Sequence, residues 1–278
     1  MTANLLGAFQ SIASSCGQPQ KSAQQLFDLL PSALQNCRVL FLGDDRTWYY
    51  FFAANYDRLP NDMVGCGTDQ TVPVVRLYCG LRTFKSRFSD NIVRTFVGKL
   101  ANPDKHLETL AELAPLLRIP DSVEVEYEVP GSGTDGKKID YTFKVNAHAP
   151  ILLDVKYRSR GKIDHFKEII PHLSAGVVGV QDLELTPPDP QNLFRDTVDK
   201  FISRSPAECL QGVWIHPDLK YEKRTLENCF HGLDSGRLHF AILAYWNEKA
   251  YVLAKNQATR ERIASFFNLI HSNDFVVE

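Results

Sequence analysis

The sequence lacks the features by which several classes of protein are recognised. Its six cysteines form no C-x-x-C pair and are scattered along the chain, which indicates reduced thiols rather than a disulfide framework or a zinc site. No apolar run approaches the roughly 20 residues needed to cross a bilayer, and the N-terminus lacks the basic start and apolar stretch of a signal peptide. We therefore expect a cytoplasmic protein that has no membrane partner.

The sequence also lacks the local motifs of several common catalytic machineries. It contains no Gly-rich phosphate loop, and no serine or cysteine sits in a nucleophile-elbow motif. The net charge of −2 argues against a protein that coats nucleic acid non-specifically. A local basic patch is still allowed, because electrostatic attraction depends on where the charges lie.

The length of 278 residues allows one or two domains. Residues 1–84 mix helical and strand patterns, and we expect them to form an N-terminal α+β region of unknown role. Within this region, the spacing of residues 21–34 predicts a helix, and residues 71–77 are predicted as a strand. Residues 85–278 are expected to form a second, α/β domain.

The most regular patterns of the second domain predict three consecutive strands. Apolar residues alternate with polar ones in 123–129 and in 139–145, and a Gly-rich connection at 131–136 separates the two runs. Residues 151–157 start with a continuous apolar run, which is typical of a central strand covered on both faces. Further patterns predict helices at 163–173, 193–202 and 259–270, a strand at 210–216 and a hairpin over 238–254.

The third of these strands carries the triplet Asp154-Val155-Lys156. Because side chains alternate along a strand, Asp154 and Lys156 must point to the same face. Charges at the end of an apolar strand are costly unless they are paired or bound to a metal. Asp140 stands alone on the preceding strand. The other acidic-x-Lys triplets, which begin at Asp135 and Asp218, fall in turn and loop sequences, so context selects Asp154.

Basic residues surround these two aspartates. The stretch 137–162 holds seven lysines and arginines but only two acidic residues. A polyanion approaching an acidic, metal-filled notch would be attracted by such a patch. The alternative interpretation is a solvated charged hairpin.

The order helix, three strands, helix, strand, with Asp140 on the second strand and Asp154-x-Lys156 on the third, resembles the core of the PD-(D/E)xK nuclease superfamily. More narrowly, Leu152-Leu-Asp-Val-Lys-Tyr-Arg158 is similar to the "LDAKYR" strand of McrC-type restriction subunits. The resemblance covers about residues 85–220 and implies a restriction-endonuclease-like core, a mixed sheet flanked by helices.

The resemblance also implies a metal-dependent nuclease. In that interpretation Asp140, Asp154 and the carbonyl of Val155 hold Mg²⁺ or Mn²⁺, and Lys156 completes the catalytic set. Contacts to backbone phosphates of DNA or RNA would come from Arg158, Arg160 and Lys162. Enzymes that cut both strands often pair their active sites, so a homodimer or a partner protein subunit is a further expectation.

Two features of the superfamily have no clear counterpart in this sequence. The acidic residue that often comes from the first helix is not identified, because Glu108 and Glu112 lie opposite the apolar stripe of their predicted helix. A Gln or Lys on the second helix is common, and Lys167 is a weak match to it. Without this acid, a second metal position would be in doubt, whereas the first metal position would not be affected.

Three alternatives remain open at the level of sequence. Asp154 and Lys156 can form an ion pair at a solvent-facing strand end. The chain can also be a catalytically inactive nuclease-fold module that binds nucleic acid or a partner protein. Finally, it can be an unrelated enzyme whose centre lies near Asp44, Asp45 and Trp48 in the first region.

Overall fold

A computed structural model provides the structure of the protein, and the described parts of the chain are residues 4–42, 47–51, 72–102, 105–130, 132–144, 148–158, 190–217, 223–233, 236–244 and 250–269. The chain divides into two compact units, Met1–Asp121 (unit 1) and Ser122–Glu278 (unit 2). The sequence predicted a division after residue 84, where the part that resembles the nuclease superfamily begins. That boundary stays a prediction.

Unit 1 combines helices with a small antiparallel sheet of order β1-β2-β3. Its elements are α1 (Leu5–Ser15), α2 (Gln20–Phe27), α3 (Ser32–Gln35), β1 (Arg38–Leu42), β2 (Thr47–Phe51), β3 (Val72–Pro73), α4 (Val74–Arg87), α5 (Asp90–Leu100), α6 (His106–Ala111) and the 3₁₀ turn η3 (Pro115–Arg118).

Two sequence predictions in unit 1 are wrong in their details. The strand expected at residues 71–77 is confined to β3, and the chain then enters α4. Val74, Leu77 and Leu81 recur at helical spacing and are buried, and this period outweighs the β-branched character of the run. The helix expected at residues 21–34 breaks into α2 and α3, because Pro31 cannot continue a helix.

A buried histidine links the sheet of unit 1 to its helices. His106 at the start of α6 has its Nδ1 atom 2.8 Å from the carbonyl oxygen of Leu100, and its Nε2 atom 2.8 Å from the hydroxyl of Tyr50 on β2. A carbonyl only accepts, so Nδ1 carries the proton and Nε2 accepts from Tyr50. The imidazole is thus neutral, with both nitrogens bonded inside the protein.

Unit 2 is built on a six-stranded mixed sheet of order β4-β5-β6-β7-β8-β9. Its elements are β4 (Glu124–Val129), the 3₁₀ turn η4 (Thr134–Gly136), β5 (Ile139–Lys144), β6 (Ile151–Arg158), α8 (Pro190–Val198), β7 (Leu210–Pro217), α9 (Lys223–His231), β8 (Phe240–Ala244), β9 (Ala250–Ala254) and α10 (Gln257–Phe266). The pairings β4–β5, β5–β6 and β8–β9 are antiparallel, whereas β6–β7 and β7–β8 are parallel.

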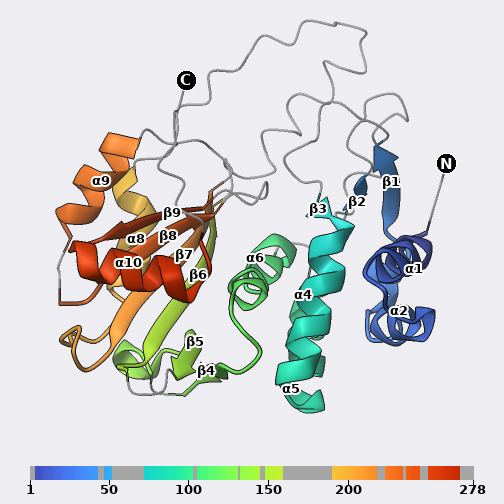
Figure 1. Cartoon of the computed structure of the whole chain (residues 1–278), viewed down its shortest axis with the longest axis horizontal. Helices are drawn as coiled ribbons and strands as arrows, with labels where there is room; N and C mark the ends of the chain where they lie inside the picture. Colours follow the sequence, from blue (N-terminus) through green and yellow to red (C-terminus); the bar gives the residue numbers. More distant parts are fainter. Residues whose placement is uncertain are drawn as a thin grey trace, which may run out of the picture. The chain divides into compact units, whose positions relative to one another are not determined.

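Helices cover both faces of this sheet, as Figure 1 shows for α10 in front of the strands and α8 behind them. On the α8 face, Leu193 and Phe194 of α8 pack into one buried cluster with Val213 and Ile215 of β7. On the other face, the ring of Trp214 lies 5.4 Å from that of Phe267, just after α10. The prediction of a mixed sheet flanked by helices is confirmed.

Of the two strands that carry the predicted site residues, β5 and β6, the central strand β6 is the more buried. Its first five residues are all buried, as expected for a strand that has neighbours on both edges and helices on both faces. Leu152, Asp154 and Lys156 alternate with residues of the opposite face, so they lie on the α8 face with Val213. The side chains of Asp154 and Lys156 therefore lie on the face of the sheet that α8 covers.

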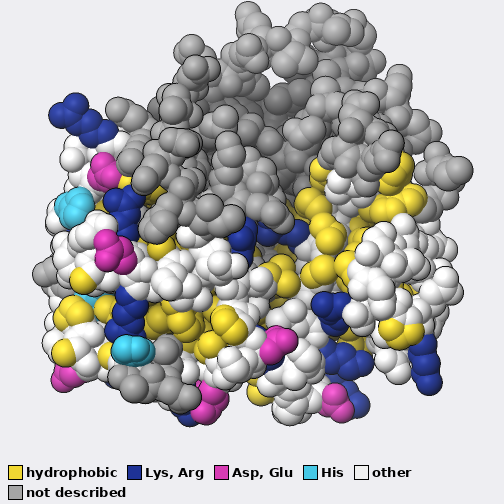
Figure 2. Space-filling model, in the orientation of Figure 1, with side chains coloured by type: hydrophobic (Ala, Val, Ile, Leu, Met, Phe, Trp, Pro, Cys, Tyr) yellow, Lys and Arg dark blue, Asp and Glu magenta, His cyan; other side chains and the backbone are white. Residues whose placement is uncertain are grey.

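Among the described residues, none of the helices combines the length and the apolarity that a membrane span needs. On the face shown in Figure 2, Lys and Arg side chains lie interspersed with Asp and Glu side chains over the described surface of unit 2. This mixed pattern agrees with the small net charge of the chain.

Candidate metal and nucleic-acid site

The two aspartates singled out by the sequence occupy adjacent positions on neighbouring strands. Asp140 is the second residue of β5, and Asp154 is the fourth residue of β6. Tyr141 pairs with Leu153 in this antiparallel register, so the next step along the two strands sets Asp140 opposite Asp154. Residues directly opposite each other share a face of the sheet. The two carboxylates consequently converge on the α8 face.

Asp154 is fully buried, with 0% of its side chain exposed. Leaving a carboxylate there without a partner would cost several kcal/mol, and two ammonium groups compensate it. The Nζ atom of Lys156 lies 2.9 Å from its Oδ2 atom, and the Nζ atom of Lys200 donates to its Oδ1 atom. Asp154 is the centre of a cluster that comprises Asp140, Asp154, Lys156 and Lys200, here called the carboxylate–lysine cluster.

Lys200 contacts both carboxylates. Besides its bond to Asp154, its Nζ atom lies 3.9 Å from Oδ1 of Asp140. It follows α8 by two residues, in the crossover between the two parallel strands. The sequence analysis missed this residue and named Lys167 instead, which lies outside the described residues. The sequence around Lys200 indicates its role only weakly, because it shows a single lysine followed by Phe201, which is buried.

The backbone of Lys200 is held in place by the turn between β4 and β5. Thr134 donates its N–H to the carbonyl oxygen of Lys200 at 2.8 Å and its hydroxyl to that of Asp199 at 2.8 Å. A Cβ atom on Gly133 would lie 2.8 Å from the Lys200 carbonyl oxygen and 2.7 Å from that of Lys137. Such contacts are too short, so only glycine allows the turn to approach this closely. The base of the Lys200 side chain is thereby fixed.

Val155 connects Asp140 to the central strand. Its backbone N–H donates to Oδ2 of Asp140 at 2.6 Å, a short distance typical of a bond to a charged acceptor. The N–H and C=O groups of one strand residue point to the same edge of the strand. The Val155 carbonyl thus faces the same edge as the Asp140 carboxylate, as the predicted ligand set requires.

Lys156 keeps its charge in this environment. Burial lowers the pKa of Lys156, but attraction to the Asp154 carboxylate, a hydrogen bond to it and the more distant charge of Asp140 outweigh burial, so the pKa lies above its ordinary value. Its side chain is 26% exposed, which leaves the ammonium accessible to a ligand. The cluster as a whole holds two carboxylates and two ammonium groups.

The residues present fit a hard divalent cation. The Oδ2 atom of Asp154 is buried and has no well-aligned hydrogen-bond partner, although the Lys156 ammonium lies beside it. The donors at the cluster are carboxylate and carbonyl oxygens, which Mg²⁺ and Mn²⁺ prefer. Within the described part of the chain, no group of three or more His, Cys, Asp and Glu side chains gathers at one point. The set would therefore supply two carboxylates and leave further positions to the carbonyl and to water.

The predicted phosphate contacts lie only partly within the described residues. Arg158 directs its Nη2 atom to the carbonyl oxygen of Leu193 and to the carboxylate of Asp196, each at 3.4 Å, so the structure ties it to α8. Arg160 and Lys162 lie outside the described residues. Several basic residues of the predicted patch are also ion-paired, because Lys138 contacts Glu128, and Lys144 contacts Glu124 and Glu126.

The alternative centre that the sequence raised in the first region falls partly outside the described residues, because Asp44 and Asp45 are not among them. Trp48 is on β2, where its ring lies 4.6 Å from that of Phe41. The two rings are tilted by 51° and pack side chains of β1 and β2 against each other.

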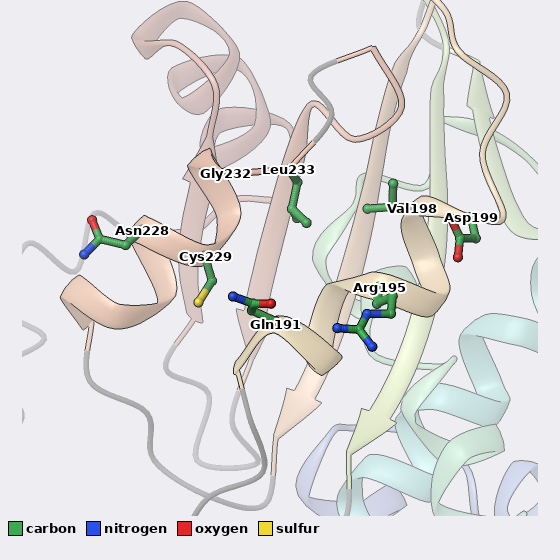
Figure 3. Close-up of a pocket in the computed structure, with 8 residues that line it drawn as sticks. All are labelled: Gln191, Arg195, Val198, Asp199, Asn228, Cys229, Gly232 and Leu233. Atoms are coloured by element: carbon green, nitrogen blue, oxygen red, sulfur yellow. The ribbon is translucent and has the colours of Figure 1, made fainter.

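A pocket of about 260 Å³ opens between α8 and α9, away from the carboxylate–lysine cluster. As Figure 3 shows, side chains of both helices line it, among them Arg195, Asp199 and Cys229. Its lining includes no member of the cluster. Arg195 and Asp199 give the lining groups of opposite charge, and this mixture does not indicate one class of ligand.

Comparison with known proteins gave no match: no family model, no curated protein and no solved structure is similar to the chain. A function for this chain therefore has to be inferred from the geometry of the carboxylate–lysine cluster.

Proposed function

We propose that this chain is a metal-dependent nuclease that hydrolyses phosphodiester bonds, with DNA as the first substrate to test and RNA as the second. One observation carries the proposal. A fully buried carboxylate, Asp154, faces a second one, Asp140, across adjacent strands at a position already occupied by a cation, with the Lys156 ammonium beside it. A buried acidic pair with ammonium groups at an accessible edge is an expensive arrangement, and such arrangements concentrate at functional sites.

The strand order supports a restriction-endonuclease-like core. Three antiparallel strands, β4, β5 and β6, are followed by a helical crossover and by β7, which is parallel to β6. This is the order expected of the PD-(D/E)xK superfamily, with the two aspartates on the second and third strands. The strand order thus supports the proposal, with Asp140 on β5 and Asp154 on β6.

Each residue of the cluster has a chemical role in this proposal. Asp140, Asp154 and the Val155 carbonyl would hold Mg²⁺ or Mn²⁺. When bound, such an ion polarises a phosphate oxygen and lowers the pKa of a coordinated water. Lys156 orients the attacking water and neutralises charge that develops on the phosphate. Asp154 is itself buried, so its carboxylate is shielded from bulk water.

The decisive experiment compares cleavage by variants of two lysines. Plasmid and single-stranded DNA are incubated with Mg²⁺ or Mn²⁺ and either wild type, Lys156→Ala or Lys144→Ala. Lys144 serves as the matched control, because it lies on the same face of β5 as Asp140 but pairs with exposed glutamates. We expect Lys156→Ala to lower the cleavage rate by at least about 100-fold, the scale of losing one transition-state contact, and Lys144→Ala to leave it unchanged.

Metal dependence is checked in the same experiment by adding chelator and by testing Asp140→Asn. Both should abolish cleavage, and calorimetry should show weaker Mn²⁺ binding by Asp140→Asn. Equal cleavage by wild type and Lys156→Ala would contradict the assigned role of Lys156. Cleavage by wild type that survives chelator would contradict the metal site.

One observation favours a second function. The Lys156 and Lys200 ammonium groups together already balance the two carboxylates, so the same fold could serve as a catalytically inactive module that binds nucleic acid. That function predicts DNA binding that chelator does not change, together with no cleavage in either metal. The two functions are therefore separated by the same incubation.

A further inference from the structure

Lys200 lies where a cation shared by Asp140 and Asp154 would lie. Its ammonium contacts Asp154 and approaches Asp140 to 3.9 Å, and only 17% of its side chain is exposed. Lys156 differs, because its ion pair is with Oδ2 of Asp154. Lys200 is thus the ammonium that bridges the two strands.

Lys144 makes a comparable contact with two carboxylates at an exposed position. It also bridges two carboxylates, those of Glu124 and Glu126, at 2.7 Å each, but 47% of its side chain is exposed. Water and salt screen that arrangement, so it contributes little. Around Asp154, screening is weak, and each charge in the cluster must be balanced by another.

The charge balance of the cluster decides what can happen when a divalent cation arrives. Among the residues that the structure describes, the two carboxylates and two ammonium groups of the cluster sum to zero. Adding a divalent cation while both ammonium groups stay would leave a charge of +2 beside a fully buried side chain, which is strongly unfavourable. The Lys200 ammonium is the one that would have to move, because it lies against oxygens of both carboxylates and so competes with the ion for them.

The chain allows Lys200 to move without disturbing the fold. Its backbone is fixed by Thr134 and by a hydrogen bond from its own N–H to Thr197. Its four-carbon stem can rotate about several bonds between staggered positions.

We propose that the Lys200 ammonium is an internal cation that occupies the metal position of the metal-free protein and is displaced by the incoming divalent ion. This inference rests on the proposed metal site and adds to it how that site is regulated. Lys200 holds the two strands together before metal arrives and weakens metal binding by competing with it. Once displaced, the ammonium is available at the edge of the site to a phosphate.

The test measures Mn²⁺ binding by calorimetry and thermal unfolding of wild type, Lys200→Met and the control Lys144→Met. Methionine keeps the apolar stem and removes the charge. We expect Lys200→Met to bind Mn²⁺ about tenfold more tightly than wild type, a change equivalent to about 1.4 kcal/mol. Without metal its Tm should fall by roughly 5 °C, since a buried carboxylate loses a partner. Lys144→Met should match wild type in both measurements.

Excess Mn²⁺ should raise the Tm of Lys200→Met more than that of wild type, because the ion replaces the missing charge and binds only the folded state. Lys200→Gln, which retains a hydrogen-bond donor, serves as the second variant if Lys200→Met does not fold. Mn²⁺ affinity of the uncharged variants equal to or below that of wild type would overturn the proposal.

The outcomes separate this inference from the proposed function. If wild type and Lys200→Met bind Mn²⁺ equally, and Asp140→Asn weakens both, the metal site stands and displacement of Lys200 is wrong. If Asp140→Asn changes binding in neither background, the metal site itself is wrong. Binding that tightens in Lys200→Met and is lost again in the double variant with Asp140→Asn would support both.

Discussion

In unit 1 the buried imidazole of His106 is neutral and uses both of its ring nitrogens inside the protein, on Tyr50 and Leu100. In unit 2 the buried carboxylate of Asp154 is held by two ammonium groups whose side chains are 17% and 26% exposed. Both side chains are buried, but the partners of the first are neutral groups and those of the second are charged.

This difference distinguishes a cluster that stabilises the fold from a cluster that is suited to bind a ligand. A neutral cluster with all partners internal specifies how a sheet and helices fit together, and it gains nothing from a ligand. A charged cluster at an accessible edge costs more to build and is less fully satisfied, since Oδ2 of Asp154 lacks a well-aligned hydrogen bond. The proposed binding and chemistry accordingly belong to unit 2, whereas the His106 cluster stabilises unit 1.

The largest effect on this comparison should come from Asp154→Asn. Removing the buried charge leaves two ammonium groups facing one carboxylate, and we expect unit 2 to lose about 3 kcal/mol of stability, the scale of breaking a buried ion pair. Hydrogen exchange in β6 peptides, against β2 peptides as the internal reference, measures the loss. Adding Lys200→Met restores the charge balance, so the double variant should lose less than the sum of the single losses. Additive losses would show that the charges are not coupled.

The second largest effect should be a loss of stability of unit 1 at acidic pH. Burial lowers the pKa of His106 to about 4, against an opposing effect of its bond to Leu100. The unfolded chain takes up this proton near pH 6.5, whereas the folded chain does not until about pH 4. Stability is complete above about pH 6.5 and falls as the pH drops toward 4, by about 3 kcal/mol at roughly 1.36 kcal/mol per pKa unit.

The measurement for this prediction is hydrogen exchange in α6 and β2 peptides as a function of pH, on wild type and on His106→Leu. The leucine variant lacks the titrating group, so its exchange should depend less on pH between about 6.5 and 4. An unchanged pH slope in the variant would assign the acid sensitivity to other groups.

The smallest of the three effects should come from Tyr50→Phe. The change removes the hydroxyl that donates to Nε2 of His106 and leaves a buried acceptor without its partner. We expect a loss of about 1–2 kcal/mol in unit 1, in the range for an unmade buried hydrogen bond. Mn²⁺ affinity and any cleavage should match wild type, because the cluster of unit 2 is untouched. A change in Mn²⁺ affinity would contradict the separation of roles.

Much of unit 2 was predictable from the sequence because its signals are local. The alternation in β4 and β5 and the apolar run of β6 identify three strands, and the two-residue period sets Asp154 and Lys156 on one face. In unit 1 the periods of short apolar runs are ambiguous, and Val74 with its neighbours is compatible with strand or helix until Leu81 and Phe84 are included.

The part of the site that escaped prediction depends on contacts distant in sequence. Lys200 is 46 residues from Asp154, and no period or motif joins the two. Its place is set by how far the crossover runs before β7 pairs with β6, which is a tertiary property. The same holds for Arg158: a sequence shows a basic residue, but only the packing of α8 shows that Asp196 faces it.

The tight approach of Gly133 to the Lys200 carbonyl has a consequence for how this chain can change during evolution. Surface hairpins usually accept insertions and larger residues freely, yet here any side chain would displace a lysine that comes much later in the chain. Substitution at this turn, outside the cluster itself, is accordingly a route by which mutation or design could shift Lys200 relative to the two carboxylates while every charged group stays in the sequence.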